Sequence, residues 1–213
     1  MASDQKIVYQ ACDNAIRAMN RENLEDFGRL KATRWDEIQI IRRVVALYAR
    51  NAKKARKRYF EVAFEAYILA LLMCGIEAKK AHKMAEKEIS LDWVDDMLER
   101  VDPVAGYMFE RETERKAYRL AETLEVSNDR DFEINKALRF WSQQLGQFAI
   151  NATDYAMIEA YKDAGIKEVY WVTQKDERVC EDCEDLDGQT FPVDEIPPKP
   201  HLGCRCLILP VIE

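Results

Sequence analysis

The chain has 213 residues, a formal net charge of −7, 48% hydrophobic residues and 33% charged residues. This length accommodates one domain, or two small ones, with a substantial hydrophobic core. A protein whose whole surface wraps nucleic acid is excluded, because non-specific DNA affinity comes mainly from cations that neutralise phosphates. Glycine (7 residues) and proline (6 residues) are scarce, so the composition predicts a mainly α-helical fold.

The sequence predicts no contact with a membrane. Its most apolar stretch, residues 62–76, contains Glu65 and is too short for a bilayer core of about 30 Å. The first twenty residues are interrupted by charges from Asp4 to Arg17, unlike the apolar core of a secretory leader. We therefore expect a protein that folds in a reducing cytoplasm, where disulfides are rare.

Two long helical patterns open the chain. Apolar residues in the segment 4–19 recur at the spacing of one helix face, which predicts an amphipathic helix with Cys12 in its core. A heptad pattern then extends from residue 38 to residue 76. Its members are Ile38, Ile41, Val45, Tyr48, Ala52, Ala55, Tyr59, Val62, Ala66, Leu69, Met73 and Ile76. This seam predicts a packing surface on a helix about 60 Å long, or on a hairpin if the helix breaks near its middle.

A basic segment occupies the middle of that pattern. Its six cations are Arg50, Lys53, Lys54, Arg56, Lys57 and Arg58. They are interpreted either as a solvated helix face or as a contact for DNA phosphates or for an acidic partner surface. Any DNA contact here would be non-specific, because no base-reading motif accompanies the cations.

Shorter helices are expected between residues 77 and 124, with an N-cap at Ser90 and a break at Asp102-Pro103. A turn at residues 127–129 precedes a last helix whose apolar face continues to about Lys162. Ala164-Gly165 ends that helix, because glycine adopts the left-handed conformation of a C-cap. Two β-rich segments follow, residues 168–173 and 206–212, and they predict a pair of strands.

Four cysteines and a histidine gather near the C-terminus. Cys180 and Cys183 form a C-x2-C pair, Cys204 and Cys206 form a C-x-C pair, and His201 lies between the pairs. This spacing favours a structural zinc site of four thiolates, or of three thiolates and one imidazole in which His201 competes with a member of the second pair. Two disulfides or four unliganded thiols are the alternatives.

The residues around this cluster carry a family resemblance. The features are N-A-T-D-Y-A at residues 151–156, Trp171-Val172-Thr173, Asp176-Glu177-Arg178-Val179-Cys180, Cys183, Leu186-Asp187-Gly188, Phe191, Ile196-Pro197-Pro198, His201 and Cys204-Arg205-Cys206. Together they resemble the C-terminal module of the Mu F-like minor head proteins of tailed phages, over roughly residues 130–213. One departure is His201-Leu202-Gly203-Cys204, where the family more often has His-Pro-x-Cys.

The resemblance implies a structural and assembly protein. Family members are phage minor head (minor capsid) proteins that associate with the portal vertex during head morphogenesis, and some accompany DNA on packaging or ejection. The implied partners are the portal protein and other capsid proteins, with several copies at one vertex. The implied location is the virion, after assembly in the host cytoplasm.

Two other functions remain open at this stage. One is a non-specific double-stranded DNA-binding module that acts through residues 50–58. The other is an enzyme or toxin fused to a head-protein module, which is disfavoured because the sequence contains no catalytic constellation. We therefore expect a protein that is not an enzyme.

The expected organisation has two parts. Residues 1–129 form an α-helical N-terminal region, and residues 130–213 form the C-terminal module, with its Cys/His β module at residues 169–213. The predicted fold is mainly α, with long helices in a bundle-like body. A small β-hairpin module stapled by the Cys/His cluster closes the chain.

Overall fold

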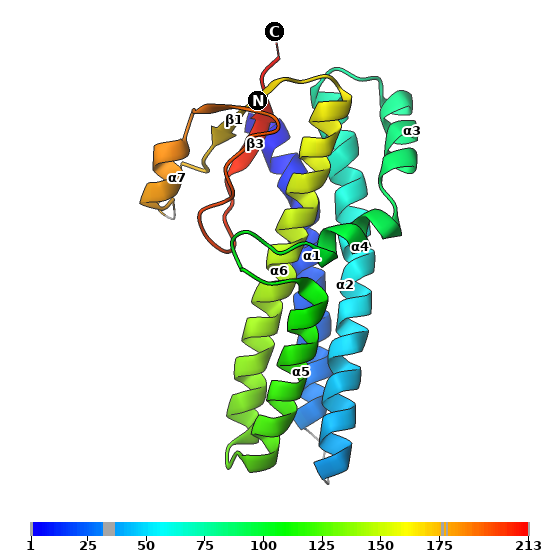
Figure 1. The fold of residues 1–213 in the computed structure, drawn as a ribbon, viewed down its shortest axis with the longest axis vertical. Coiled ribbons are helices and arrows are strands. Elements are labelled where there is room, and N and C mark those ends of the chain that lie inside the picture. Colours follow the sequence, from blue (N-terminus) through cyan, green and yellow to red (C-terminus); the bar gives the residue numbers. More distant parts are fainter. Residues whose placement is uncertain (1, 32–36, 176, 178, 213) are drawn as a thin grey trace.

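In a computed structural model of the chain, the structure describes residues 2–31, 37–175, 177 and 179–212. Four long helices lie side by side along the length of the molecule (Figure 1), and a small sheet lies beside one end of them. The helices are α1 (Ala2–Lys31), α2 (Glu37–Met73), α3 (Ala78–Glu88), α4 (Leu91–Glu99), α5 (Phe109–Val126), α6 (Arg130–Asp163) and α7 (Glu181–Leu186). The strands are β1 (Glu168–Val172), β2 (Thr190–Pro192) and β3 (Leu207–Pro210). The predicted mainly α fold is confirmed.

The core lies where α1, α2, α5 and α6 meet. The Tyr48 ring of α2 lies 4.8 Å from the Trp141 ring of α6 and 5.7 Å from the Phe27 ring of α1, measured between centroids. Phe109 of α5 stacks on Trp141 at 5.9 Å. Because each aromatic side chain buries about 150–250 Å², this cluster ties the four helices together. Cys12 is fully buried in the same core, as predicted.

Helix α1 extends well beyond the segment 4–19 that the sequence predicted. Its later turns bury Met19, Phe27 and Leu30, but Asn23 and Asp26 lie on the same buried face. These two polar residues interrupt the apolar periodicity, so the sequence pattern stops near residue 19 although the helix continues to Lys31. The Asp26 carboxylate is satisfied by Lys54 of α2, with 3.2 Å between Nζ and Oδ2.

Helix α2 is continuous, which decides between the long helix and the hairpin that the sequence left open. The predicted seam residues Tyr48, Tyr59 and Val62 are buried, whereas Ile41 is exposed. Ile40, Val44 and Leu47, which the seam did not include, are buried as well. The side chain of Ile38 lies outside the described residues. Because α2 packs against α1, α5 and α6 together, it buries a broad face and not the narrow seam of a two-helix coiled coil.

The helix ends follow the predicted signals. The Trp93 backbone N–H donates to Ser90 Oγ at 3.1 Å and so caps α4. Asp129 caps α6 by accepting from the Phe132 N–H at 3.0 Å. Gly165 has φ of 79° after the end of α6, which is the left-handed conformation that glycine adopts without strain.

The sheet is antiparallel in the order β2-β1-β3. Strand β1 pairs with β3 in the register Trp171↔Ile208, so the predicted strand pair is confirmed. It also pairs with β2 in the register Val169↔Phe191. The Tyr161 hydroxyl of α6 donates to the Ile208 carbonyl at 3.1 Å, which fastens the sheet to the bundle. None of the helices in the described part of the chain has the length and apolarity that crossing a membrane requires.

The buried face of α2 makes a testable prediction. Val62 is 3% exposed, so Val62→Asp would place an unpaired carboxyl group in an apolar interface and, even if that group is protonated, should lower the free energy of unfolding by about 2–7 kcal/mol. Ile41→Asp is the matched control, because Ile41 is 38% exposed on the same helix. Urea unfolding followed by circular dichroism measures both variants. Equal losses of stability would contradict the burial of Val62.

Candidate metal centre

The first pair of cysteines is positioned by the short helix α7. Cys180 is its N-cap residue and Cys183 lies in its first turn, so both thiols belong to one helix terminus. Asp187 ends the helix and accepts from the Thr173 N–H at 2.8 Å, which returns the chain toward β1. Gly188 has φ of 78°, and its N–H donates to the Trp171 carbonyl at 2.8 Å. Asp187-Gly188 therefore forms the turn that follows α7.

The second half of the cluster comes from the loop before β3. His201 begins a tight turn in which the Cys204 N–H donates to the His201 carbonyl at 3.3 Å. Gly203 supplies the positive φ of 71° that this turn requires. Cys204 and Cys206 are buried, and Arg205 between them is half-buried. This alternation is that of an extended segment, in which Cys204 and Cys206 point to the same side.

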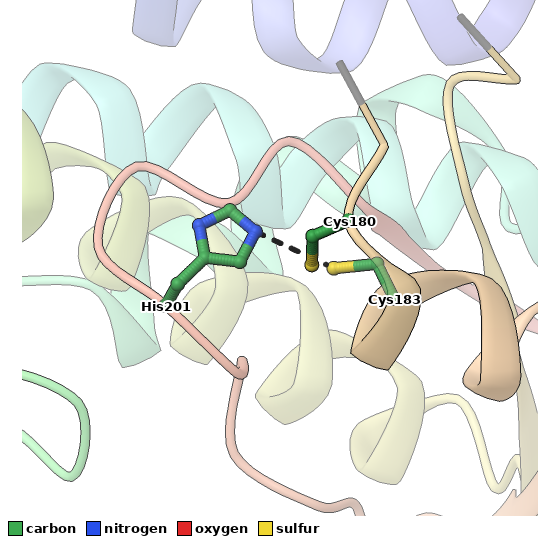
Figure 2. Close-up of side chains that lie close together, drawn as sticks. All are labelled: Cys180, Cys183 and His201. Carbon is green, nitrogen blue, oxygen red and sulfur yellow. Dashed lines mark hydrogen bonds between the residues drawn. The ribbon is translucent and has the colours of Figure 1, made fainter. Parts of the chain in front are cut away.

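The five candidate ligands form two groups that share Cys183. Cys180, Cys183 and His201 make one group, and Cys183, Cys204 and Cys206 make the other, with the ligand atoms of each group within 4.8 Å of one another. Figure 2 shows the first group, in which the His201 ring points toward the two sulfurs. Segments about twenty residues apart in the chain thus converge on one thiol, as the sequence predicted.

The shortest separations fit a tetrahedral zinc site. Cys183 Sγ lies 3.5 Å from His201 Nε2 and 3.6 Å from Cys204 Sγ. Zinc bonds of about 2.3 Å to sulfur and about 2.0–2.1 Å to nitrogen separate two sulfurs by about 3.8 Å, and a sulfur from a nitrogen by about 3.5 Å. The donor set and its spacing therefore suit zinc.

The alternative of two disulfides does not match the structure. All six cysteines are free thiols. The 3.6 Å between the sulfurs of Cys183 and Cys204 is far longer than a disulfide bond of about 2.05 Å.

His201 is oriented as a ligand. Its Nδ1 lies 3.1 Å from the Leu202 carbonyl oxygen, so the proton is held at Nδ1 and the lone pair of Nε2 faces Cys183. A backbone carbonyl that fixes the tautomer in this way is the usual support of a metal-binding histidine.

The thiols differ sharply in acidity. A hydrogen bond from Cys206 lowers the pKa of Cys204 to about 5, and burial raises the pKa of Cys183 to about 12. The pKa of Cys206 is raised because its proton is held by the Cys204 sulfur. This hydrogen bond therefore favours the thiolate form of Cys204 over that of its neighbours. A divalent cation would supply the positive charge that allows further thiols to ionise.

A buried ion pair attaches the proline-rich segment before His201 to the bundle. Lys199 Nζ lies 2.7 Å from Asp154 Oδ2 of α6, and the two side chains are only 6% and 12% exposed. Lys199 also donates to the Tyr9 hydroxyl of α1 at 2.8 Å, and Tyr9 in turn donates to Asp154. Sequence reasoning missed these contacts, because neither Tyr9 nor Asp154 has a local pattern that marks a partner so distant in the chain.

A series of hydrogen bonds from α6 supports the loop that carries His201 and Cys204, here called the metal loop. The Gly203 N–H donates to Gln147 Oε1 at 2.8 Å, and Gln147 Nε2 donates to Asn151 Oδ1 at 3.0 Å. Asn151 then donates to Asp102 in the loop between α4 and α5. The side-chain amides of Gln147 and Asn151 are buried, so these hydrogen bonds avoid the cost of burying polar groups without partners. Asn151 belongs to the N-A-T-D-Y-A run noted in the sequence, whereas Gln147 had no sequence signal.

The basic segment of α2 is divided by the structure into two sets. Three of its cations pair with carboxylates of α1 and α4, namely Lys54 with Asp26 (3.2 Å), Arg56 with Asp95, and Arg58 with Glu22 (3.1 Å). Arg50, Lys53 and Lys57 are exposed, and no described residue offers them an acidic partner. Half of the segment is thus engaged within the chain, which the sequence could not indicate.

Comparison with known proteins confirms the resemblance. Residues 108–209 match the family model described as Phage Mu protein F like protein, which is just under half of the chain. The match starts at α5, whereas the resemblance recognised in the sequence starts at about residue 130. It runs through α6, the sheet and all five candidate ligands. No curated protein and no solved structure matches the chain.

The geometry makes a prediction about metal content. Protein purified under reducing conditions should contain about one equivalent of zinc, and Cys183→Ser should lose it because Cys183 joins both ligand groups. Cys74→Ser is the matched control, since Cys74 lies outside both groups. Elemental analysis measures the metal. Equal zinc in the two variants, or less than about a tenth of an equivalent in the parent, would contradict a zinc site.

Proposed function

We propose that the protein is a phage minor head protein that takes part in head morphogenesis at the portal vertex. The observation that carries the proposal is the family match over residues 108–209, which covers α5, α6 and the Cys/His module. The expected partners are the portal protein and other capsid proteins. Several copies acting at one vertex, and a role in DNA packaging or ejection, belong to the same proposal.

The role of the metal centre in this proposal is structural. The loops that carry the ligands contribute little apolar core of their own, because the segment between β1 and β3 includes only the short elements α7 and β2. Bound zinc would supply the cross-link that holds these loops together. The chain itself positions the ligands through the Lys199–Asp154 ion pair and the Gln147–Gly203 hydrogen bond. A rigid module at one end of a helical bundle is suited to docking within an assembly.

The proposed role is not enzymatic. Polar groups near the module are already engaged in structural contacts, as Asp154 is with Lys199 and Asn151 is with Asp102. Three of the four thiols Cys180, Cys183, Cys204 and Cys206 would serve as ligands of the proposed metal site together with His201, and the fourth lies beside them.

Localisation within a purified phage head tests this proposal. A cryo-electron microscopy map should show density for the α1–α6 bundle at the portal vertex, in several copies, and a deletion of the gene should remove that density. Heads assembled without the protein should be defective in morphogenesis or in DNA packaging. Density spread evenly over the capsid shell, or normal heads formed in its absence, would contradict a role at the portal.

A second function is supported by the unpaired half of the basic segment. Arg50, Lys53 and Lys57 lie on one exposed face of α2, because their spacing of three and four residues repeats once per helical turn. Such a row can contact phosphates of double-stranded DNA without reading sequence. We propose this contact as an alternative role, or as a complement to the role in head assembly.

Matched charge removal tests the DNA contact. The variant Arg50→Gln/Lys53→Gln/Lys57→Gln should bind duplex DNA more weakly, with a salt slope shallower by about 0.9 for each lost phosphate contact. Lys54→Gln/Arg56→Gln/Arg58→Gln removes the same charge from cations that already have partners, and should change the slope less. Fluorescence anisotropy across a salt series measures both. Equal slopes for the two variants would show that the exposed row has no special role.

A further inference from the structure

A groove on the bundle surface lies away from the metal centre. It runs between residues 115–123 of α5 and residues 133–140 of α6. Its volume is about 450 Å³, which is in the range of ligand and side-chain pockets. Figure 1 shows α5 beside α6 at the end of the molecule opposite the sheet. The lining of the groove includes the cations Arg115, Lys116, Arg119 and Lys136 and the apolar residues Leu120 and Phe140.

The groove carries an excess of positive charge. Four of its lining residues are cations and one is an acid. Arg115 and Lys116 share a single carboxylate, Glu112, at 2.6 and 3.6 Å. Lys136 lies 4.0 Å from Glu133, and Arg119 has no acidic partner within the described ranges. The groove therefore keeps unneutralised cations on a chain whose net charge is −7.

Apolar surface lies beside these cations. Phe140 is 43% exposed, and its ring is flanked by Lys116 Nζ at 5.7 Å and by the Arg139 guanidinium at 5.5 Å. Phe132 is also exposed and lies two helical turns earlier, so the row Phe132, Lys136 and Phe140 alternates aromatic and cationic side chains on α6. Leu120 and Ala137 add apolar surface to the groove itself.

We propose that the α5–α6 groove binds an acidic segment of a partner protein, in which an apolar side chain is flanked by Asp or Glu residues. The apolar side chain inserts against Phe140 and Leu120, and the flanking carboxylates pair with Arg119, Arg115 and Lys136. A desolvated apolar anchor surrounded by charge-complementary contacts is the usual composition of a protein-binding site.

An acidic protein segment with an apolar side chain fits the groove better than duplex DNA does. Non-specific DNA binding needs cations exposed along an open surface, and Arg50, Lys53 and Lys57 are exposed in this way on α2. Here the cations border a concave site with Phe140 and Leu120 in its lining, and a phosphate backbone cannot bury apolar surface there. Burial also lowers the pKa of Lys116, whose charge a carboxylate from a partner would stabilise.

Selection from a random peptide library on the full-length protein tests the proposal. Enriched peptides should combine Asp or Glu with an aromatic or large aliphatic residue. The variant Arg119→Glu/Lys136→Glu should weaken their binding by at least about tenfold, since it replaces attraction with repulsion at two contacts. Phe140→Ser should weaken binding by removing the apolar wall. All three positions are exposed, so circular dichroism should show unchanged helicity.

Lys53→Glu/Lys57→Glu is the matched control, because it makes the same change of charge on the exposed face of α2. This variant should bind the selected peptides as the parent does. The proposal is overturned if no peptide is enriched, if enriched peptides lack acidic residues, or if they bind the groove variant and the parent equally. It is also overturned if a DNA duplex binds the groove more tightly than the selected peptides and loses that binding in the groove variant alone.

Discussion

Packing of α6 against both the helical bundle and the C-terminal segments is the constraint on which the rest of the structure depends. The helix packs against α1 and α2. Its Tyr161 side chain holds the sheet, and its Asp154 side chain, which also accepts from Tyr9 of α1, holds the segment that leads to His201. Four of the fully buried positions in its second half are alanines, with Ala149, Ala152, Ala156 and Ala160 recurring at three- and four-residue steps. This spacing places the alanines on one face of the helix, where their small side chains let a neighbouring element approach closely. The bundle and the Cys/His module therefore form around one shared helix.

The cysteine cluster supplements this arrangement where apolar contacts are few. The sheet has a buried side through Val169 and Trp171, but the ligand loops outside it are mostly polar and half-buried or exposed. Their positions come from specific polar contacts, such as the Lys199–Asp154 pair, and from convergence on Cys183. A buried ion pair destabilises the fold when one partner is lost, so these contacts specify a single placement of the loops. Bonds from a bound metal to its ligands would further restrain these loops in the same positions.

Strong local patterns made the long elements predictable from sequence. The apolar periodicity of α2 and α6 and the cap residues Ser90 and Gly165 act within a few turns of the chain, so they can be read without knowledge of the fold. Helix α7 and strand β2 were missed because they are too short to show a period. The support of the metal loop by Gln147 and Lys199 was missed for another reason. These contacts join residues far apart in the chain, and only the packing of α6 brings them together.

X-ray absorption spectroscopy at the zinc edge of the purified protein tests the central claim most directly, namely that a metal joins α7 to the loop before β3. The separations around Cys183 and the tautomer of His201 predict a shell of three sulfurs at about 2.3 Å and one nitrogen at about 2.0–2.1 Å. The sulfurs expected in that shell belong to Cys180, Cys183 and one member of the C-x-C pair. A shell of nitrogen and oxygen alone would contradict the account, because it would show that zinc binds elsewhere on the chain.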